Sequence, residues 1–99
     1  MQRRHESASI NRDRLRRDIV EEEQLRRGIA RHEALRRSSP ELWRAFEQTR
    51  AAQNDAIAAT NRRLVTLGLK AIALEPSLAQ RRRRLKRLEA SNMAALMDS

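Results

Sequence analysis

Mostly apolar residues return at alternating spacings of three and four through the middle of the chain. This heptad pattern comprises Trp43, Phe46, Arg50, Gln53, Ile57, Thr60, Leu64, Leu67, Ala71 and Leu74. It is typical of a helix that buries one stripe against a partner, with polar central positions that help to set the register. The pattern therefore predicts a central, coiled-coil-like helix over residues 39–74, which we call the heptad seam helix.

Two proline-containing breaks bound this helix. In the first, Ser38 and Glu41 have the spacing of a capping box, with a proline between them in the first turn. In the second, Pro76 lacks an N–H and disfavours helix at the residue before it, and Ser77 then fits as the cap of a new helix. The breaks predict three helical segments.

The flanking segments are also typical of helices. We expect a flexible start over residues 1–8, a heavily charged helix over 9–37 and a basic helix over 77–97. No segment alternates with a period of two residues, so strands are not expected. The predicted fold class is all-α: one domain of 99 residues, built as a long helical hairpin or three-helix chain.

The predicted central helix is longer than the third helix can cover. An apolar seam left uncovered favours self-association, so we expect a homo-oligomer built on this helix. The expected contact residues lie at the ends and in the middle of the seam: Trp43, Phe46, Ile57, Leu64, Leu67, Ala71 and Leu74.

Positive charge is concentrated near the C-terminal end. The chain has 22 Lys+Arg against 13 Asp+Glu, a net charge of +9. Six of these cations fall within seven residues, and we expect them to bind a polyanion: Arg81, Arg82, Arg83, Arg84, Lys86 and Arg87. The sequence places Arg81, Arg83, Arg84 and Arg87 on the side away from Leu78, Leu85 and Leu88. The alternative is that the run is only a solvated helix face.

No arrangement of residues that would support catalysis or metal binding is expected from the sequence. Without cysteine there is no thiolate metal site, and His5 and His32 are far apart in sequence. Gly28 and Gly68 are isolated, so no phosphate-binding loop is expected. We therefore expect a protein that is not an enzyme and has no cofactor or metal. The start of the chain lacks a signal-peptide pattern, which favours a cytoplasmic location.

These features favour a helical assembly protein that binds the nucleic-acid backbone without sequence specificity. No zinc finger, stacking platform or recognition helix accompanies the basic run. At the level of architecture alone, an oligomerising hairpin with a basic appendage resembles the central part of viral small terminase subunits. A role in DNA packaging or in a nucleoid would fit this architecture.

An alternative is a helical adaptor that binds a partner protein. The stretch from Glu41 to Val65, with Asn61 before Leu64 and Val65, is similar to the long central helix of flagellar export chaperones of the FlgN type. That resemblance implies binding of a partner's helix. A third reading uses the basic helix with Met93, Leu96 and Met97 at a membrane surface, and it ranks lower because interfacial aromatics are missing there.

Overall fold

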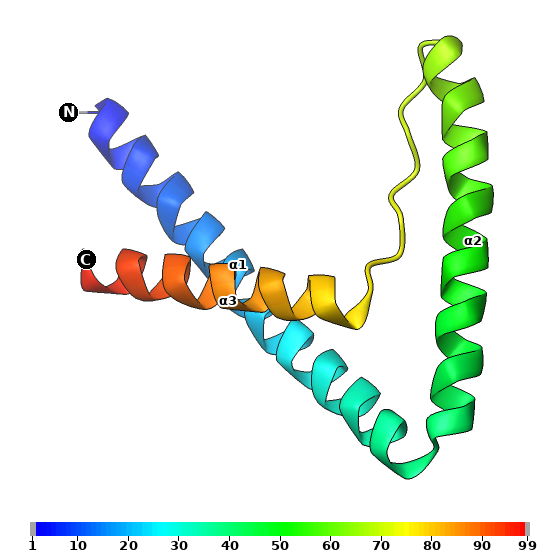
Figure 1. Ribbon diagram of the computed structural model, residues 1–99. Helices are drawn as coiled ribbons and strands as arrows, with labels where there is room; N and C mark the ends of the chain where they lie inside the picture. Colours follow the sequence, from blue (N-terminus) through cyan, green and yellow to red (C-terminus); the bar gives the residue numbers. More distant parts are fainter. Residues whose placement is uncertain (1, 99) are drawn as a thin grey trace. The chain divides into compact units, whose positions relative to one another are not determined.

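The computed structural model describes the backbone of residues 2–98 and the side chains of residues 11–98. It contains three helices, α1 (Gln2–Ser38), α2 (Pro40–Thr66) and α3 (Leu78–Met97), and no strand in this described part (Figure 1). The all-α fold with three helices is therefore confirmed. The flexibility expected for residues 1–8 stays a prediction, because Met1 and the side chains of this segment lie outside the described residues.

The chain forms two compact units, although its length predicts a single domain. Unit 1 combines α1 up to Arg31 with α3 from Ala79 onward, and unit 2 runs from His32 to Leu78. Buried residues are few and are divided between the units. Ile29, Leu88 and Asn92 belong to unit 1, and Leu78 belongs to unit 2.

Unit 1 is a pair of helices that cross and pack through heptad-spaced positions (Figure 1). On α1, the more buried positions include Leu15, Asp18, Glu22, Leu25 and Ile29. On α3, they are Arg81, Leu85, Leu88 and Asn92. Spacings of three and four keep each set on one helix face.

The start of α2 differs in detail from the predicted cap. Ser39, rather than Ser38, occupies the cap position, with Pro40 in the first turn and no side-chain cap hydrogen bond. Ser38 ends α1, and its hydroxyl donates to the carbonyl of Leu35 over 3.4 Å. The Ser38–Glu41 capping box is therefore wrong, although the helix does break at this serine pair. The fixed φ of Pro40 favours a helix start without help from the box.

The end of α2 corrects the predicted range more strongly, because the helix stops at Thr66 instead of residue 74. Gly68 adopts a left-handed φ of 73°. Its N–H donates to the carbonyl of Val65 at 3.0 Å, and the N–H of Leu69 donates to that of Leu64 at 2.8 Å. These two bonds make a Schellman motif, in which glycine avoids the steric cost of a left-handed residue.

Residues 67–77, which we call the strap, begin with the turn at Leu67 and Gly68, and residues 69–77 then return along α2 as an extended chain (Figure 1). Three predicted seam residues, Leu67, Ala71 and Leu74, therefore lie on the strap and not on a helix. Their placement in the heptad seam is wrong, because Leu67 is already the C-cap residue of α2 and the turn at Gly68 reverses the chain before Ala71 and Leu74. The helix resumes at Leu78, two residues after Pro76.

The half-buried face of α2 is also shifted from the predicted seam. Its members again follow a heptad spacing: Trp43, Glu47, Arg50, Asn54, Ile57, Asn61 and Leu64. The predicted positions from Trp43 to Leu64 at seven-residue spacing are half-buried as expected. The second set of predicted positions, Phe46, Gln53 and Thr60, is exposed, and the residue that follows each of them is half-buried instead. The strap explains the shift at Asn54 and Asn61, because it hydrogen-bonds to both side chains.

Candidate functional site

The basic run lies in the first half of α3, and its cations differ in their surroundings. Arg81 is half-buried among the heptad positions of α3, so its predicted placement away from the leucines is wrong: residue 81 follows Leu78 by three and precedes Leu85 by four. Arg82 is exposed, and like Arg81 it has contacts within the chain. The run is therefore not a uniform solvated stripe.

Arg84 forms an ion pair between α3 and α1. Its guanidinium donates to both carboxylate oxygens of Glu21, over 2.7 and 2.8 Å. This hydrogen bond and the negative charge of Glu21 raise the pKa of Arg84, a group that is already protonated at neutral pH. Arg84 thus has a structural partner within unit 1, which the sequence did not predict.

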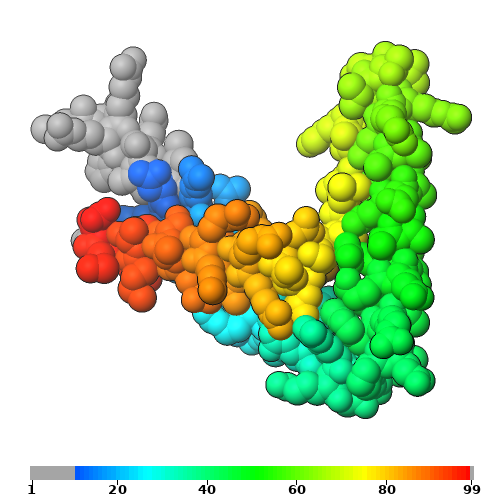
Figure 2. All heavy atoms as spheres, viewed as in Figure 1, coloured from blue at the N-terminus to red at the C-terminus, as the bar shows by residue number. Residues whose placement is uncertain are grey.

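Three cations remain on the outer side of α3. Arg83, Lys86 and Arg87 are exposed, and within the described part of the chain none of them has an ion-pair partner. Spacings of three and four from Arg83 to the other two place the three groups on one side of the helix. Figure 2 shows α3, in orange and red, as a ridge lying across α1. These three side chains form the outer basic patch.

Nearby charges of unit 1 are paired to each other. Arg26 contacts Glu22 and Glu23 on its own helix and Glu89 on α3, at 3.2, 3.2 and 3.6 Å. Desolvation lowers the pKa of Arg26, but the hydrogen bond to Glu22 and the charges of Glu22, Glu89 and Glu23 together raise it above its ordinary value. Asn92, buried on α3, donates to Glu22 at 3.3 Å. Glu21 and Glu22 of α1 therefore pair with Arg84 and Asn92 of α3, and not with the three residues of the outer basic patch.

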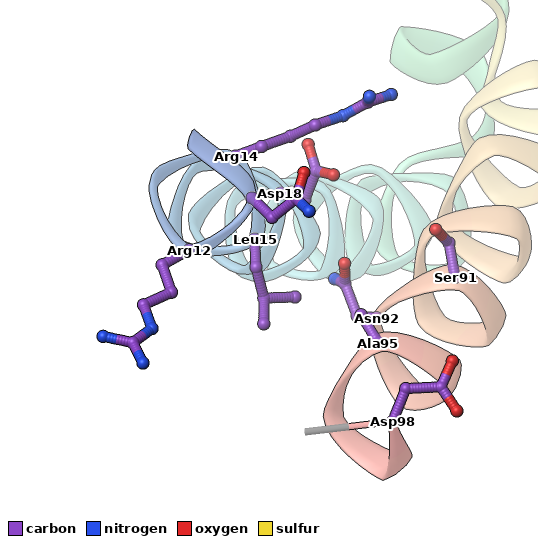
Figure 3. A pocket seen from close by; sticks show the side chains of 9 residues that line it. Arg12, Arg14, Leu15, Asp18, Ser91, Asn92, Ala95 and Asp98 are labelled. Carbon is purple, nitrogen blue, oxygen red and sulfur yellow. The ribbon is translucent and has the colours of Figure 1, made fainter. Parts of the chain in front are cut away.

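A hollow of about 540 Å³ lies between α1 and the C-terminal half of α3 (Figure 3). Leu15 and Asn92 point toward it, whereas Arg12 and Arg14 extend to opposite sides. Its lining mixes both signs of charge: Asn11, Arg12, Arg14, Leu15, Asp18, Ser91, Asn92, Ala95 and Asp98. Among the described residues no three His, Asp or Glu side chains gather to hold a metal ion. The mixed lining does not select one class of ligand.

The expected oligomerisation residues are divided between helix and strap. Trp43 stacks on Phe46 with ring centroids 5.6 Å apart, and His32 lies within 5.5 Å of both rings. Ile57 and Leu64 are half-buried farther along α2. The remaining three lie on the strap, where Leu67 is 72% exposed and Leu74 is 52% exposed. Among the described residues of α2, none is fully buried.

Two asparagines of α2 have a role that sequence reasoning missed. Asn54 and Asn61 each hydrogen-bond to both backbone groups of one strap residue, Glu75 and Ile72 respectively. We call this pair the amide clamp. Asparagine is disfavoured within helices because its side chain competes for backbone hydrogen bonds. The sequence did contain a signal for this role, because the two asparagines are seven residues apart and therefore lie on one face of the predicted helix.

No protein-family model, curated protein or solved structure matches this chain. None of the helices in the described residues is both long and apolar enough to cross a membrane.

Proposed function

We propose that this protein binds the nucleic-acid backbone without sequence specificity through the outer basic patch of α3, and that it is not an enzyme. One observation carries the proposal: Arg83, Lys86 and Arg87 project from α3 while Arg84 is held by Glu21. Arginine pairs bidentately with phosphate, and lysine adds a point charge. A DNA-packaging or nucleoid-type role, in the cytoplasm and without a cofactor, fits this activity.

Three phosphate contacts per chain give weak binding that falls steeply with salt. For duplex DNA, a plot of the logarithm of the binding constant against the logarithm of the salt concentration has a negative slope. The slope is about −0.9 for each phosphate that the protein neutralises. Self-association would present several patches to one polymer and raise the overall affinity. We propose a homo-oligomer, supported by the absence of fully buried residues among the described residues of α2 and by the exposure of Phe46. Sedimentation at micromolar concentration tests it, and a well-folded monomer would refute it.

The test of binding is a fluorescence anisotropy titration with duplex DNA of mixed sequence at low salt. Replacing Arg83, Lys86 and Arg87 by Gln should lower the affinity for all sequences alike, by about tenfold or more. A matched control replaces Arg44, Arg62 and Arg63 of α2 by Gln, with the same loss of three charges. If both triple variants bind equally, the patch is only a solvated face and the binding reflects net charge.

A helical adaptor remains the second candidate because α3 changes character toward its end. Met93 and Met97 are 61% and 78% exposed, and they follow Lys86 on the outer side of the helix at helical spacing. Methionine side chains adapt to many apolar surfaces. A partner's amphipathic helix would contact these two residues. Loss of capture of that helix in Met93→Asp with Met97→Asp, with DNA binding retained, would support the adaptor role.

A further inference from the structure

The amide clamp forms hydrogen bonds with the backbone of an extended chain. Asn61 donates to the carbonyl of Ile72 at 2.9 Å and accepts from its N–H at 2.7 Å. Asn54 makes the same pair of bonds with Glu75, at 2.8 and 2.9 Å. A neighbouring β-strand satisfies one residue in the same reciprocal way. Each amide therefore acts as a substitute for a strand residue, on the side of a helix.

The two clamp positions match the repeat of an extended chain. Seven helical residues separate Asn54 from Asn61, a rise of about 10.5 Å. Three extended residues separate Ile72 from Glu75, a rise of about 10 Å. Because the two distances agree, both amides are satisfied together by residues n and n+3 of an extended segment whose backbone groups return to the same side every third residue, as in a polyproline II-like conformation. Arg50 adds a weaker donor at 3.4 Å to the carbonyl of Glu75.

All five of these hydrogen bonds end on backbone atoms of the strap, and they use none of its side-chain atoms. The apolar side chains of the strap are poorly covered: Leu69, Ile72 and Leu74 are 50–55% exposed. At Ile72 and Glu75, these bonds therefore use only groups that every non-proline residue has. A segment with exposed hydrogen bonds and little buried apolar surface opens locally at a low free-energy cost.

Space for the side chains of an occupant is present beside the clamp. A shallow groove of about 500 Å³ borders Asn61 and Leu74 of the strap. Its other lining residues come from α2, and they are Ala58, Arg62, Val65 and Thr66. The groove combines aliphatic carbon with an exposed arginine, so an occupant with a small apolar side chain fits without meeting a buried charge.

We propose that Asn54 and Asn61 form a binding site for an extended peptide segment, and that the strap is its intramolecular occupant. The site accepts most sequences but excludes proline at the two peptide positions that hydrogen-bond to Asn61 and Asn54, which we call the read positions, because proline has no N–H to donate. The strap is tethered beside the site at a high effective concentration, so it outcompetes a free peptide until it is released. The site is thus closed in the isolated chain and opens on strap release. It is separate from the outer basic patch.

The test uses the full chain and a fluorescein-labelled peptide with the sequence of residues 68–77. The substitutions Ile72→Pro and Glu75→Pro remove the two strap N–H donors and leave the clamp intact. This released variant should bind the peptide at least about tenfold more tightly than wild type in an anisotropy titration, because its internal competitor is weakened. Adding Asn54→Leu and Asn61→Leu should abolish the gain.

Two control peptides separate backbone reading from side-chain recognition. A peptide with proline at both read positions should not bind, and one with its other side chains reordered should bind within about threefold of the original. If the Leu variants lose helicity by circular dichroism, Asn54→Asp with Asn61→Asp replaces them, since aspartate keeps the size and loses the donor. The proposal fails if the released variant shows no gain, if the gain persists without the clamp, or if the reordered peptide does not bind. Peptide affinity should be unchanged by replacement of Arg83, Lys86 and Arg87 with Gln, so the two proposals can fail independently.

Discussion

Unit 1 and unit 2 are held together by different kinds of contact. In unit 1 the described contacts between the two helices are made by side chains, with ion pairs such as Arg84–Glu21 and the buried Leu88. In unit 2 a helix holds an extended strap through amide-to-backbone hydrogen bonds, and the strap's apolar side chains are half exposed. The comparison teaches that heptad spacing alone does not tell whether a helix faces another helix or an extended chain.

The largest expected effect is on unit 1. Leu88→Ala removes buried aliphatic surface from the α1–α3 contact and should lower the free energy of unfolding by about 2–4 kcal/mol. Urea unfolding followed by circular dichroism measures the loss, and hydrogen-exchange mass spectrometry locates it. The control, Met93→Ala at a 61% exposed position on the same helix, should change stability by less than about 0.5 kcal/mol. Equal effects of the two variants would mean that Leu88 is not a core residue.

In unit 2 the strap depends on the amide clamp. Asn54→Ala with Asn61→Ala removes four solvent-exposed hydrogen bonds, each worth about 0.5–0.75 kcal/mol at the low end of the usual range, so the total loss should be about 2–3 kcal/mol. The amides of Ile72 and Glu75 should then exchange faster while those of α3 do not. The only tryptophan, Trp43, reports on unit 2 by fluorescence. Unchanged protection at both strap amides would show that other contacts hold the strap.

The two glycines, one in each unit, should respond to alanine with opposite signs. Gly28→Ala places a methyl group in open space within α1 and should stabilise the helix by about 0.5–1 kcal/mol. Gly68→Ala also meets no neighbouring atom, but its left-handed φ should cost about 1–2 kcal/mol. Thermal unfolding of the two variants checks the signs. Stabilisation by Gly68→Ala, with a rise in helicity, would indicate that α2 extends into the strap.

The smallest expected effect concerns the ion pair of unit 1. The side chains of Arg84 and Glu21 are 52% and 38% exposed, so solvent screens their attraction. Arg84→Gln should therefore change the free energy of unfolding by no more than about 0.5 kcal/mol. The difference from wild type should shrink further in 1 M salt. A loss that is large and independent of salt would mean that the pair is more desolvated than its exposure indicates.

Sequence patterns were sufficient for the all-α class, the three helices and the break at Ser39, because helix propensity and proline geometry act over a few neighbouring residues. The face of α3 that carries Leu85 and Leu88 was also predictable from spacing. The outer basic patch was only partly predictable. The length of the run was visible, but the pairing of Arg84 with Glu21 joins residues 63 apart in sequence.

The conformation of the strap, by contrast, was determined by tertiary structure. An isolated glycine is compatible with the interior of a helix or with its end, and at Gly68 local propensity did not separate the two. In the folded chain the helix ends there. A longer helix would have hydrogen-bonded the backbone groups of Ile72 and Glu75 within itself. Instead, Asn61 and Asn54 make these hydrogen bonds. Sequence by itself thus determined which segments favour helix. Contacts between residues 11 and 21 positions apart determined where α2 stops and which of its faces is covered.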